Sequence, residues 1–207
     1  MLIPLASLVS KYNFVLTGVL HVGAHQCEER GAYHNAGVSD DNIIWLEGNP
    51  ILVADQKRHP EIKIYQALVS DRDNEDCKLM VTNNGQSSSI LEFGTHRNSY
   101  PGVFEIERIP LRTITIDTFC TQHPELNIAA VNFVNMDIQG AELKALRGMV
   151  KLLPQCIALY LEVNTQEVYK GCALLPELDE FLASNGFKRV ELSMTSEGWG
   201  DALYIKA

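Results

Sequence analysis

The 207-residue sequence has no basic excess and no long apolar run. Acidic residues outnumber basic residues by 26 to 17, and no basic stripe is present. Nucleic-acid-binding surfaces need clustered lysine and arginine to contact phosphates, so we expect no nucleic-acid partner. No window approaches the roughly 20 apolar residues of a membrane-spanning helix, so we also expect no membrane span.

The five cysteines form no CxxC pair and are widely spaced, which argues against a disulfide framework or a zinc site. Reduced, mostly buried thiols are typical of an intracellular, cytoplasmic protein. The N-terminal segment lacks the basic stretch of a secretory signal, and Pro4, Ser7 and Lys11 interrupt its apolar residues. Residues 1–14 are instead expected to contain a short amphipathic helix.

Internal repeats and low-complexity linkers are also absent. Short apolar runs alternate with helix-like segments, as in βα units built around a parallel sheet. We expect strands at 15–22, 42–47, 62–69, 131–137, 157–163, 187–194 and 202–206, the last two as a hairpin-like pair. The expected helices are 28–36, 50–59, 141–153 and 176–184. The length favours a single domain, residues 1–207.

Residues 70–120 interrupt this alternation and include the run Ser87-Ser88-Ser89. An insertion of this length in an α/β sheet is usually functional. Ligands of such sheets bind at the carboxyl ends of the strands, so we expect the insertion to form part of an active-site cleft.

Three strand ends carry residues suited to ligand binding. The first runs into Gly23 and Ala24, where glycine lets the backbone approach a ligand. The further glycines that seat a pyrophosphate are missing, which disfavours a nicotinamide-dependent oxidoreductase. Glu47 ends the second strand, where a carboxylate can accept hydrogen bonds from both hydroxyls of a ribose. Each feature also has a structural explanation: a tight turn without a ligand, or a helix-capping glutamate.

The third strand end is Asn135-Met136-Asp137-Ile138-Gln139-Gly140, which leads into a helix. This placement brings Asp137 to the carboxyl edge of the sheet. There it is able to bind the ammonium group of a donor, orient an acceptor or act as a base. Gln139 is a candidate to contact the same ligands. The alternative is that Asp137 only caps the following helix.

Together these segments resemble the FkbM family of methyltransferases. The matching stretches run in family order from about residue 19 to 164: LHVGAHQCEERGAYHNAG, IIWLEGNP, QSSSILEFGTHRNSYPGV, ITIDTF, NMDIQGAELKALRGM and LYLEVN. The resemblance implies an α/β class I (Rossmann-like) methyltransferase fold. Such a fold has a mostly parallel seven-stranded sheet, helices on both faces and a C-terminal antiparallel strand pair.

The resemblance also implies S-adenosyl-L-methionine as the cofactor and assigns residues to it. Gly23, Ala24 and His25 would line its methionine end, and Glu47, with Asn49 nearby, its ribose. Ala67 and Leu68 would flank the adenine. The remaining implied donor contacts are Ser88, Asp137 and Gln139. His21 and Cys27 depart from the aspartate and glycine that many family members carry, which puts the detailed contacts of this loop in doubt.

Methyl transfer to an alcohol requires alignment of the reactants and removal of a proton. The candidate catalytic residues are Asp137, His96 and Glu162. Asp137 and Glu162 are also able to bind a divalent cation through oxygen, although the spacing does not require one and no metal site is predicted. Tyr33, Tyr160 and Tyr169 are expected to pack in the core or at the cleft rim. We expect Trp199 in an exposed turn between the last two strands.

The resemblance and the lack of a basic surface favour an O-methyltransferase. It would act on a small hydroxylated acceptor, a sugar of a glycan or of a glycosylated metabolite, or another natural product. The chain would also suit one domain of a larger glycan-synthesis enzyme. The main alternative is a methyltransferase-like binding module without catalysis, against which Glu47 and Asp137 argue. A nucleic-acid methyltransferase is disfavoured by the net charge of −9.

Overall fold

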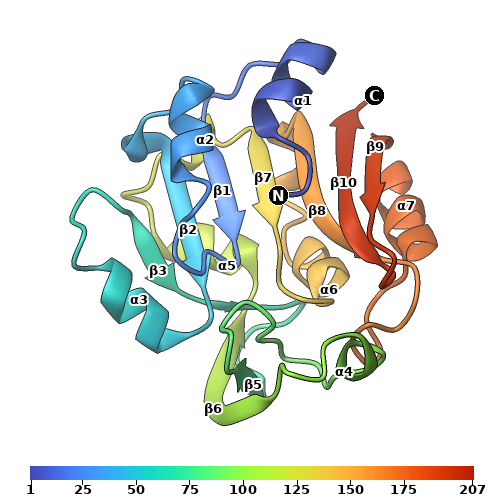
Figure 1. The fold of residues 1–207 in the computed structure, drawn as a ribbon. Coiled ribbons are helices and arrows are strands. Elements are labelled where there is room, and N and C mark those ends of the chain that lie inside the picture. The colour runs from blue at the N-terminus through green and yellow to red at the C-terminus, as the bar shows by residue number, and fades with distance from the viewer.

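A computed structural model describes residues 1–207 and contains a seven-stranded central sheet (Figure 1). The strand order is β3-β2-β1-β7-β8-β10-β9. The strands are β1 (Val19–Val22), β2 (Ile43–Glu47), β3 (Ile64–Gln66), β7 (Phe133–Met136), β8 (Ala158–Asn164), β9 (Phe187–Met194) and β10 (Trp199–Lys206). The first five strands of this order pair in parallel, and β10 runs antiparallel to both β8 and β9. The predicted fold class is therefore confirmed.

Helices pack on both faces of the sheet, because successive strand residues point to opposite faces. On one face a large core includes side chains from α5 (Ile116–Gln122), α6 (Glu142–Arg147) and α7 (Leu175–Ser184). On the other, a smaller core includes side chains from α1 (Leu5–Tyr12), α2 (Arg30–Asn35) and α3 (Pro50–Gln56). We call the face covered by α1, α2 and α3 the α1 face.

The 70–120 region, together with Leu68 and Val69 just before it, builds a second sheet at the carboxyl edge of the first. Its strand order is β4-β6-β5, from β4 (Leu68–Val69), β5 (Asp76–Thr82) and β6 (Glu105–Ile114). The short helix α4 (His96–Ser99) lies in the connection between β5 and β6. In Figure 1 strands β1 and β7 point toward this region, so the insertion lies where the parallel strands end.

Two expected strands differ from the observed ones. Strand β1 begins only at Val19. Val15 is 73% exposed, and Thr17 makes hydrogen bonds to the Asn132 side chain and the Ala130 carbonyl in place of strand pairing. The expected strand 62–69 divides into β3 and β4, which belong to different sheets. Ala67 lies at the break, where its N–H still bonds to the Glu47 carbonyl before the chain turns to pair with β6.

The expected helix 141–153 is also too long, since α6 ends at Arg147. Gly148 packs so closely against Ser70 that an added Cβ would lie 2.3 Å from the Ser70 carbonyl oxygen. Trp199 was wrongly placed in a turn: it opens β10, and its indole N–H donates to the Tyr100 hydroxyl. The remaining helices and strands differ from expectation by a few residues at their ends. No helix is both long and apolar enough to span a membrane.

Candidate active site

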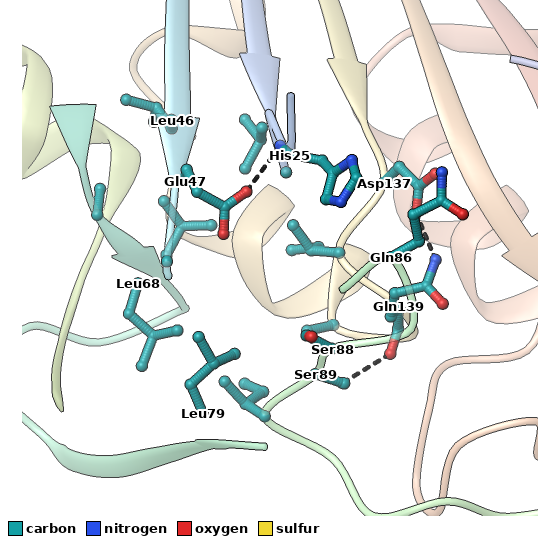
Figure 2. A pocket seen from close by; sticks show the side chains of 18 of the residues that line it. His25, Leu46, Glu47, Leu68, Leu79, Gln86, Ser88, Ser89, Asp137 and Gln139 are labelled. Atoms are coloured by element: carbon teal, nitrogen blue, oxygen red, sulfur yellow. Dashed lines mark hydrogen bonds between the residues drawn. The ribbon is translucent and has the colours of Figure 1, made fainter. Parts of the chain in front are cut away.

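A hollow of about 600 Å³, which we call the donor hollow, opens at the carboxyl ends of β1, β2 and β7. Figure 2 shows Glu47 on one side of it and Asp137 with Gln139 on the other. Its lining includes Leu68, Leu79 and, from the insertion, Ser88 and Ser89. About half of the lining is apolar, and neither lysine nor arginine contributes. The hollow is therefore suited to a ligand with an apolar ring and polar ends, and offers no lysine or arginine to a phosphate.

Gly23 makes the turn that leads from β1 into the donor hollow. Its φ is +88°, and an added Cβ would lie 1.8 Å from the Asp137 carbonyl oxygen, so no other residue fits without strain. The backbone N–H groups of Gly23 and Ala24 both donate to the Leu46 carbonyl. His25 follows with φ +45°, which also lies in the left-handed region. The turn is thus fixed by backbone contacts to β2 and β7.

Glu47 at the end of β2 lines the donor hollow and also holds this turn. One carboxylate oxygen accepts from the His25 N–H at 2.8 Å, and the other accepts from the Asn49 N–H at 2.8 Å. Burial raises the pKa of Glu47, and the two amide hydrogen bonds oppose that shift. Each oxygen retains acceptor capacity, which a diol at this position is able to use.

Asp137 and Gln139 lie on the opposite side, in the turn after β7. Gln139 adopts φ +56°, and its amide nitrogen donates to Asp137 at 2.6 Å and to Glu162 at 2.5 Å. Its amide oxygen accepts from the Tyr169 hydroxyl at 2.6 Å. The backbone carbonyl of Gln139 accepts from the Ser89 hydroxyl at 2.8 Å. Gln139 therefore connects the end of β7 with β8 through its side chain, and with the insertion through its backbone carbonyl.

A larger cleft of about 1380 Å³, which we call the acceptor cleft, lies beside the donor hollow. Its walls carry the aromatic residues Tyr100, Tyr169 and Trp199. The carboxylates that line it come from five residues: Glu28, Glu29, Asp137, Glu162 and Asp201. Three histidines and Met1, whose N-terminal ammonium lies 3.5 Å from Glu29, also line it, but no lysine or arginine does. The cleft is therefore strongly acidic and unsuited to an anionic ligand.

Burial and mutual repulsion act on these carboxylates. Burial raises the pKa of Glu162 well above its usual range, and the neighbouring Asp137 and Glu142 raise it further. Burial also raises the pKa of Asp201. At the rim, by contrast, Glu28 bonds to His25 Nδ1 at 2.6 Å and raises the pKa of that imidazole. A negative charge is therefore unfavourable on the buried Glu162 and Asp201 at the floor of the cleft. At the rim, His25 stabilises the charge on Glu28.

His96 from the insertion also lines the acceptor cleft, although it is only 5% exposed. Its Nε2 lies 3.2 Å from the Ser87 hydroxyl, whereas the buried Nδ1 has no partner. The ring stacks on Phe93 with 4.5 Å between centroids. Burial lowers the pKa of His96, which favours the neutral imidazole.

The donor hollow and the acceptor cleft share five lining residues: Gly23, His25, Gln86, Asp137 and Gln139. A ligand in one space and a ligand in the other would meet beside these residues. Of the acidic side chains that line the cleft, Asp137 is the one that also lines the donor hollow. The arrangement can therefore bring two reactants together next to a carboxylate.

The structure brings most of the expected site residues to these two spaces. Gly23, His25, Glu47, Ala67, Leu68, Ser88, Asp137 and Gln139 line the donor hollow, and His96 and Glu162 line the acceptor cleft.

Two of the expected donor contacts do not line the donor hollow. Ala24 is fully buried in the core of the α1 face, and Asn49 caps α3 by accepting from the Ile51 N–H. Neither lines the donor hollow or the acceptor cleft. Ala24 follows Gly23 directly and Asn49 comes two residues after Glu47, and in both cases the turn directs the later side chain into the protein.

Sequence reasoning missed Gln86 and Asp201 as lining residues. Gln86 directly precedes the serine run that was assigned, so its position was a usable signal. Asp201 is a charged residue within an otherwise apolar last strand, which was a signal as well. Of the three tyrosines expected to pack, Tyr33 lies in the core, and Tyr160 and Tyr169 are buried along the acceptor cleft.

Asp137 and Glu162, considered from sequence as a cation-binding pair, are bridged by the amide of Gln139. No group of three or more histidine, cysteine, aspartate or glutamate side chains is arranged to hold a metal ion. All five cysteines are free, and three of them are buried.

Comparisons with known proteins agree with this architecture. The magnesium protoporphyrin IX methyltransferase ChlM of Synechocystis PCC 6803, solved with bound SAM, aligns at TM-score 0.52 and 10% identity over 98% of this chain and 76% of that one. A precorrin-6y C5,15-methyltransferase from Geobacter metallireducens GS-15 aligns at TM-score 0.52 and 11% identity, over 98% and 86%. These likenesses establish the fold.

In sequence, the chain is 25% identical over 129 residues to the 2-O-methyltransferase NoeI of Sinorhizobium fredii (strain NBRC 101917 / NGR234). The match covers 59% of this chain and 52% of NoeI, so this chain spans about half the length of that relative.

The model of the methyltransferase FkbM domain matches residues 19–189, which include every residue that lines the donor hollow and the whole insertion. The match and the fold support the predicted cofactor, S-adenosyl-L-methionine. With its Gly23 turn, Glu47 and the Asp137–Gln139 turn at one sheet edge, the chain belongs to the family of FkbM methyltransferase domains.

Proposed function

We propose that this chain transfers a methyl group from S-adenosylmethionine to a hydroxyl of a small acceptor, a sugar of a glycan or of a glycosylated metabolite. One observation carries the proposal: the donor hollow and the acceptor cleft meet at Asp137 and Gln139. A two-substrate transfer needs such a junction, because the reacting atoms must lie in line and about 3 Å apart.

The donor hollow fits S-adenosylmethionine in its chemistry. Leu68 and Leu79 offer apolar contact to an adenine, and Glu47 offers carboxylate oxygens to a ribose diol. The donor has no phosphate, in keeping with a hollow that lacks lysine and arginine. Its sulfonium makes the methyl group readily transferable, so the chain's own residues mainly have to align the acceptor and remove a proton.

The acceptor cleft fits an uncharged or cationic, hydroxylated molecule. Carboxylates accept hydrogen bonds from hydroxyls, and the rings of Tyr100 and Trp199 offer flat apolar surfaces to the faces of a sugar ring. The 2-O-methyltransferase activity in the name of the relative NoeI supports oxygen as the methylated atom. Phosphorylated or polyanionic acceptors are disfavoured, because no cationic lysine or arginine is present to bind them.

Asp137 is the proposed base. It lies at the junction, and the amide of Gln139 donates to one of its oxygens, leaving the carboxylate oriented toward both spaces. Glu162 shares the same Gln139 amide but lines only the acceptor cleft, where it would position the acceptor. His96 also lies outside the donor hollow, so its proposed role is contact with the acceptor.

Calorimetric titration of S-adenosylmethionine and S-adenosylhomocysteine tests the donor site. We expect binding that weakens by about 10- to 100-fold in Glu47→Ala, because a charge-assisted hydrogen bond contributes roughly 1.5–3 kcal/mol. Glu61→Ala, which removes an exposed carboxylate that lines neither cavity, serves as the control and should bind normally. If the folded protein binds neither ligand, the enzyme proposal fails and a binding module without catalysis becomes the better explanation.

A further inference from the structure

His25 is the side chain of the donor hollow that is able to carry a positive charge. The ionisable residues that line this hollow are His25, Glu47 and Asp137. Met1, whose N-terminal ammonium lies 3.5 Å from Glu29, lines only the acceptor cleft. S-adenosylmethionine carries an α-carboxylate, which is ionised at neutral pH and is repelled by neighbouring carboxylates. Its binding in the hollow therefore requires a group that offsets the charges of Glu47 and Asp137.

The backbone N–H groups of the turn after β1 are already used inside the protein. Free N–H groups at such a turn commonly bind anions. Here the N–H groups of five successive residues all donate to oxygen atoms of the protein: Gly23, Ala24, His25, Gln26 and Cys27. Of these five residues, Gly23 and His25 line the donor hollow. The donor that the turn still offers to a ligand there is the His25 side chain.

The imidazole of His25 is held by one nitrogen and leaves the other unbonded. Nδ1 lies 2.6 Å from the Glu28 carboxylate, and no hydrogen bond of the protein involves Nε2. Gly85 of the insertion leaves room beside Nε2, since an added Cβ would lie 3.0 Å from it. Figure 2 shows His25 between Glu47 and Asp137, and His25 lines both spaces. Nε2 is therefore free to contact a ligand.

The bond to Glu28 makes the behaviour of Nε2 depend on the proton. A carboxylate accepts, so Nδ1 is the nitrogen that carries hydrogen in the neutral ring, and Nε2 then has a lone pair that repels an anion. The protonated ring instead presents an N–H at Nε2. Glu28 raises the pKa of His25, mainly through this hydrogen bond, whereas burial lowers it. Glu47 and Asp137 raise the pKa further, and Gly85 on the insertion side carries no charge.

We propose that protonated His25, oriented by Glu28, binds the carboxylate at the amino-acid end of S-adenosylmethionine. This inference rests on the proposed function. Nε2–H donates to the ligand carboxylate while Nδ1–H donates to Glu28, so the positive ring lies between two anions. Rising pH removes the His25 proton and with it the affinity for the carboxylate. A ligand without that carboxylate should show no such dependence on His25.

Calorimetric titration of S-adenosylhomocysteine and 5′-methylthioadenosine tests this assignment. The second ligand keeps the adenine and the ribose but lacks the amino-acid end. We expect His25→Asn to weaken S-adenosylhomocysteine binding by about tenfold or more, because a charge-assisted hydrogen bond is lost. Binding of 5′-methylthioadenosine should not change, and asparagine tolerates the left-handed backbone at this position. His34→Asn removes an exposed histidine that lines neither cavity, so it should bind both ligands normally.

The pH dependence separates the role of Glu28 from simple support of the turn. Between about pH 6 and 7.5, the affinity of the unmodified protein for S-adenosylhomocysteine should fall, and His25→Asn should remove this dependence. Glu28→Gln should shift the fall to lower pH, because the ring loses the anion that stabilises its charge. A residue that only supports the turn would lower the affinity equally at every pH. Thermal unfolding verifies that the variants are folded.

Unchanged S-adenosylhomocysteine binding in His25→Asn would overturn the inference, while binding of 5′-methylthioadenosine still upholds the donor site. Equal weakening of both ligands in this variant would overturn it as well, because His25 would then support the shape of the hollow. Failure of the unmodified protein to bind either ligand is a different result, which removes the proposed function itself.

Discussion

The side chain of Gln139 holds the acidic residues of the site in place. Its amide nitrogen donates to both Asp137 and Glu162, and its oxygen accepts from Tyr169. A left-handed backbone is uncommon for glutamine, and the buried contacts around it offset that cost. The strained backbone at Gln139 therefore places its side chain where it can orient two carboxylates.

Replacing Asp137 by asparagine tests the proposed base. The Asp137→Asn variant would keep the shape of the side chain but lose the basic carboxylate, so we expect kcat for methyl transfer to fall by about 10²–10⁴. Steady-state kinetics with the best acceptor found in screening measure this change. His96→Gln is the comparison, with an expected effect mainly on KM. A larger loss of kcat in His96→Gln than in Asp137→Asn would contradict the assignment.

Glu142 gives a prediction about stability and pH. It is 2% exposed, and its Oε1 accepts from the N–H groups of Ile138 and Gly140, next to the turn that carries Asp137 and Gln139. Burial raises the pKa of Glu142 to about 7, above its ordinary value of 4.5. The folded state thus binds a proton that the unfolded state releases. The stability this provides is complete below pH 4.5 and is lost as the pH rises through 7.

Glu142→Gln keeps the accepting oxygen and removes the charge. We expect the variant to gain free energy of unfolding relative to the unmodified protein as the pH rises from about 5 to 8. Urea unfolding at several pH values measures this difference. A difference that does not change with pH would show that Glu142 titrates normally in the folded protein.

At the scale of the elements, strands β7 and β8 change from apolar to polar along the α1 face. Strand β8 places Ala158 and Tyr160 in the core and then Glu162 and Asn164 at its carboxyl end. On β7, Phe133 is likewise followed on the same face by Asn135 and, just beyond the strand, Asp137. The two-residue period thus builds both the core and the polar floor of the acceptor cleft.

The turn after β1 gives a prediction at this scale. Gly23→Ala would place a Cβ 1.8 Å from the Asp137 carbonyl oxygen at a φ of +88°. We expect a loss of at least about 2 kcal/mol in unfolding free energy, together with loss of S-adenosylmethionine binding.

Gly31→Ala is the matched control for the change at Gly23. Gly31 lies in helix α2, where an added Cβ meets no atom within 4 Å. This substitution should stabilise the protein by about 0.5–1 kcal/mol. Similar effects of the two substitutions in chemical unfolding would mean that the Gly23 turn is not tightly constrained.

At the scale of the whole molecule, charge decides which partners are possible. The net charge is −9, and neither cavity is lined by lysine or arginine. We expect no binding of an RNA hairpin or a DNA duplex in mobility-shift assays at low salt, because binding through phosphates requires cationic contacts. A basic RNA-binding domain serves as the positive control. Salt-sensitive binding by this chain would favour a nucleic-acid acceptor.

The sequence by itself determined the central sheet and the strand ends that line the donor hollow. Short apolar runs and the residues that follow them, such as Gly23, Glu47 and Asp137, are local features, and parallel strands bring their carboxyl ends to one edge. The central sheet was therefore predictable without knowledge of distant contacts. The strand and helix ends that were wrong, at 15–18 and 148–153, depend on contacts with Asn132 and Ser70.

Only the tertiary structure decided how the acceptor cleft is composed. Asp201 meets Glu162 through the register of β8 and β10, and it meets Leu2 across 199 residues of sequence. The same is true of Tyr100, which reaches Trp199 from the insertion. The register of paired strands and the long-range contacts depend on how the whole core packs. Contacts between residues that are distant in sequence therefore cannot be predicted from the local sequence around either residue.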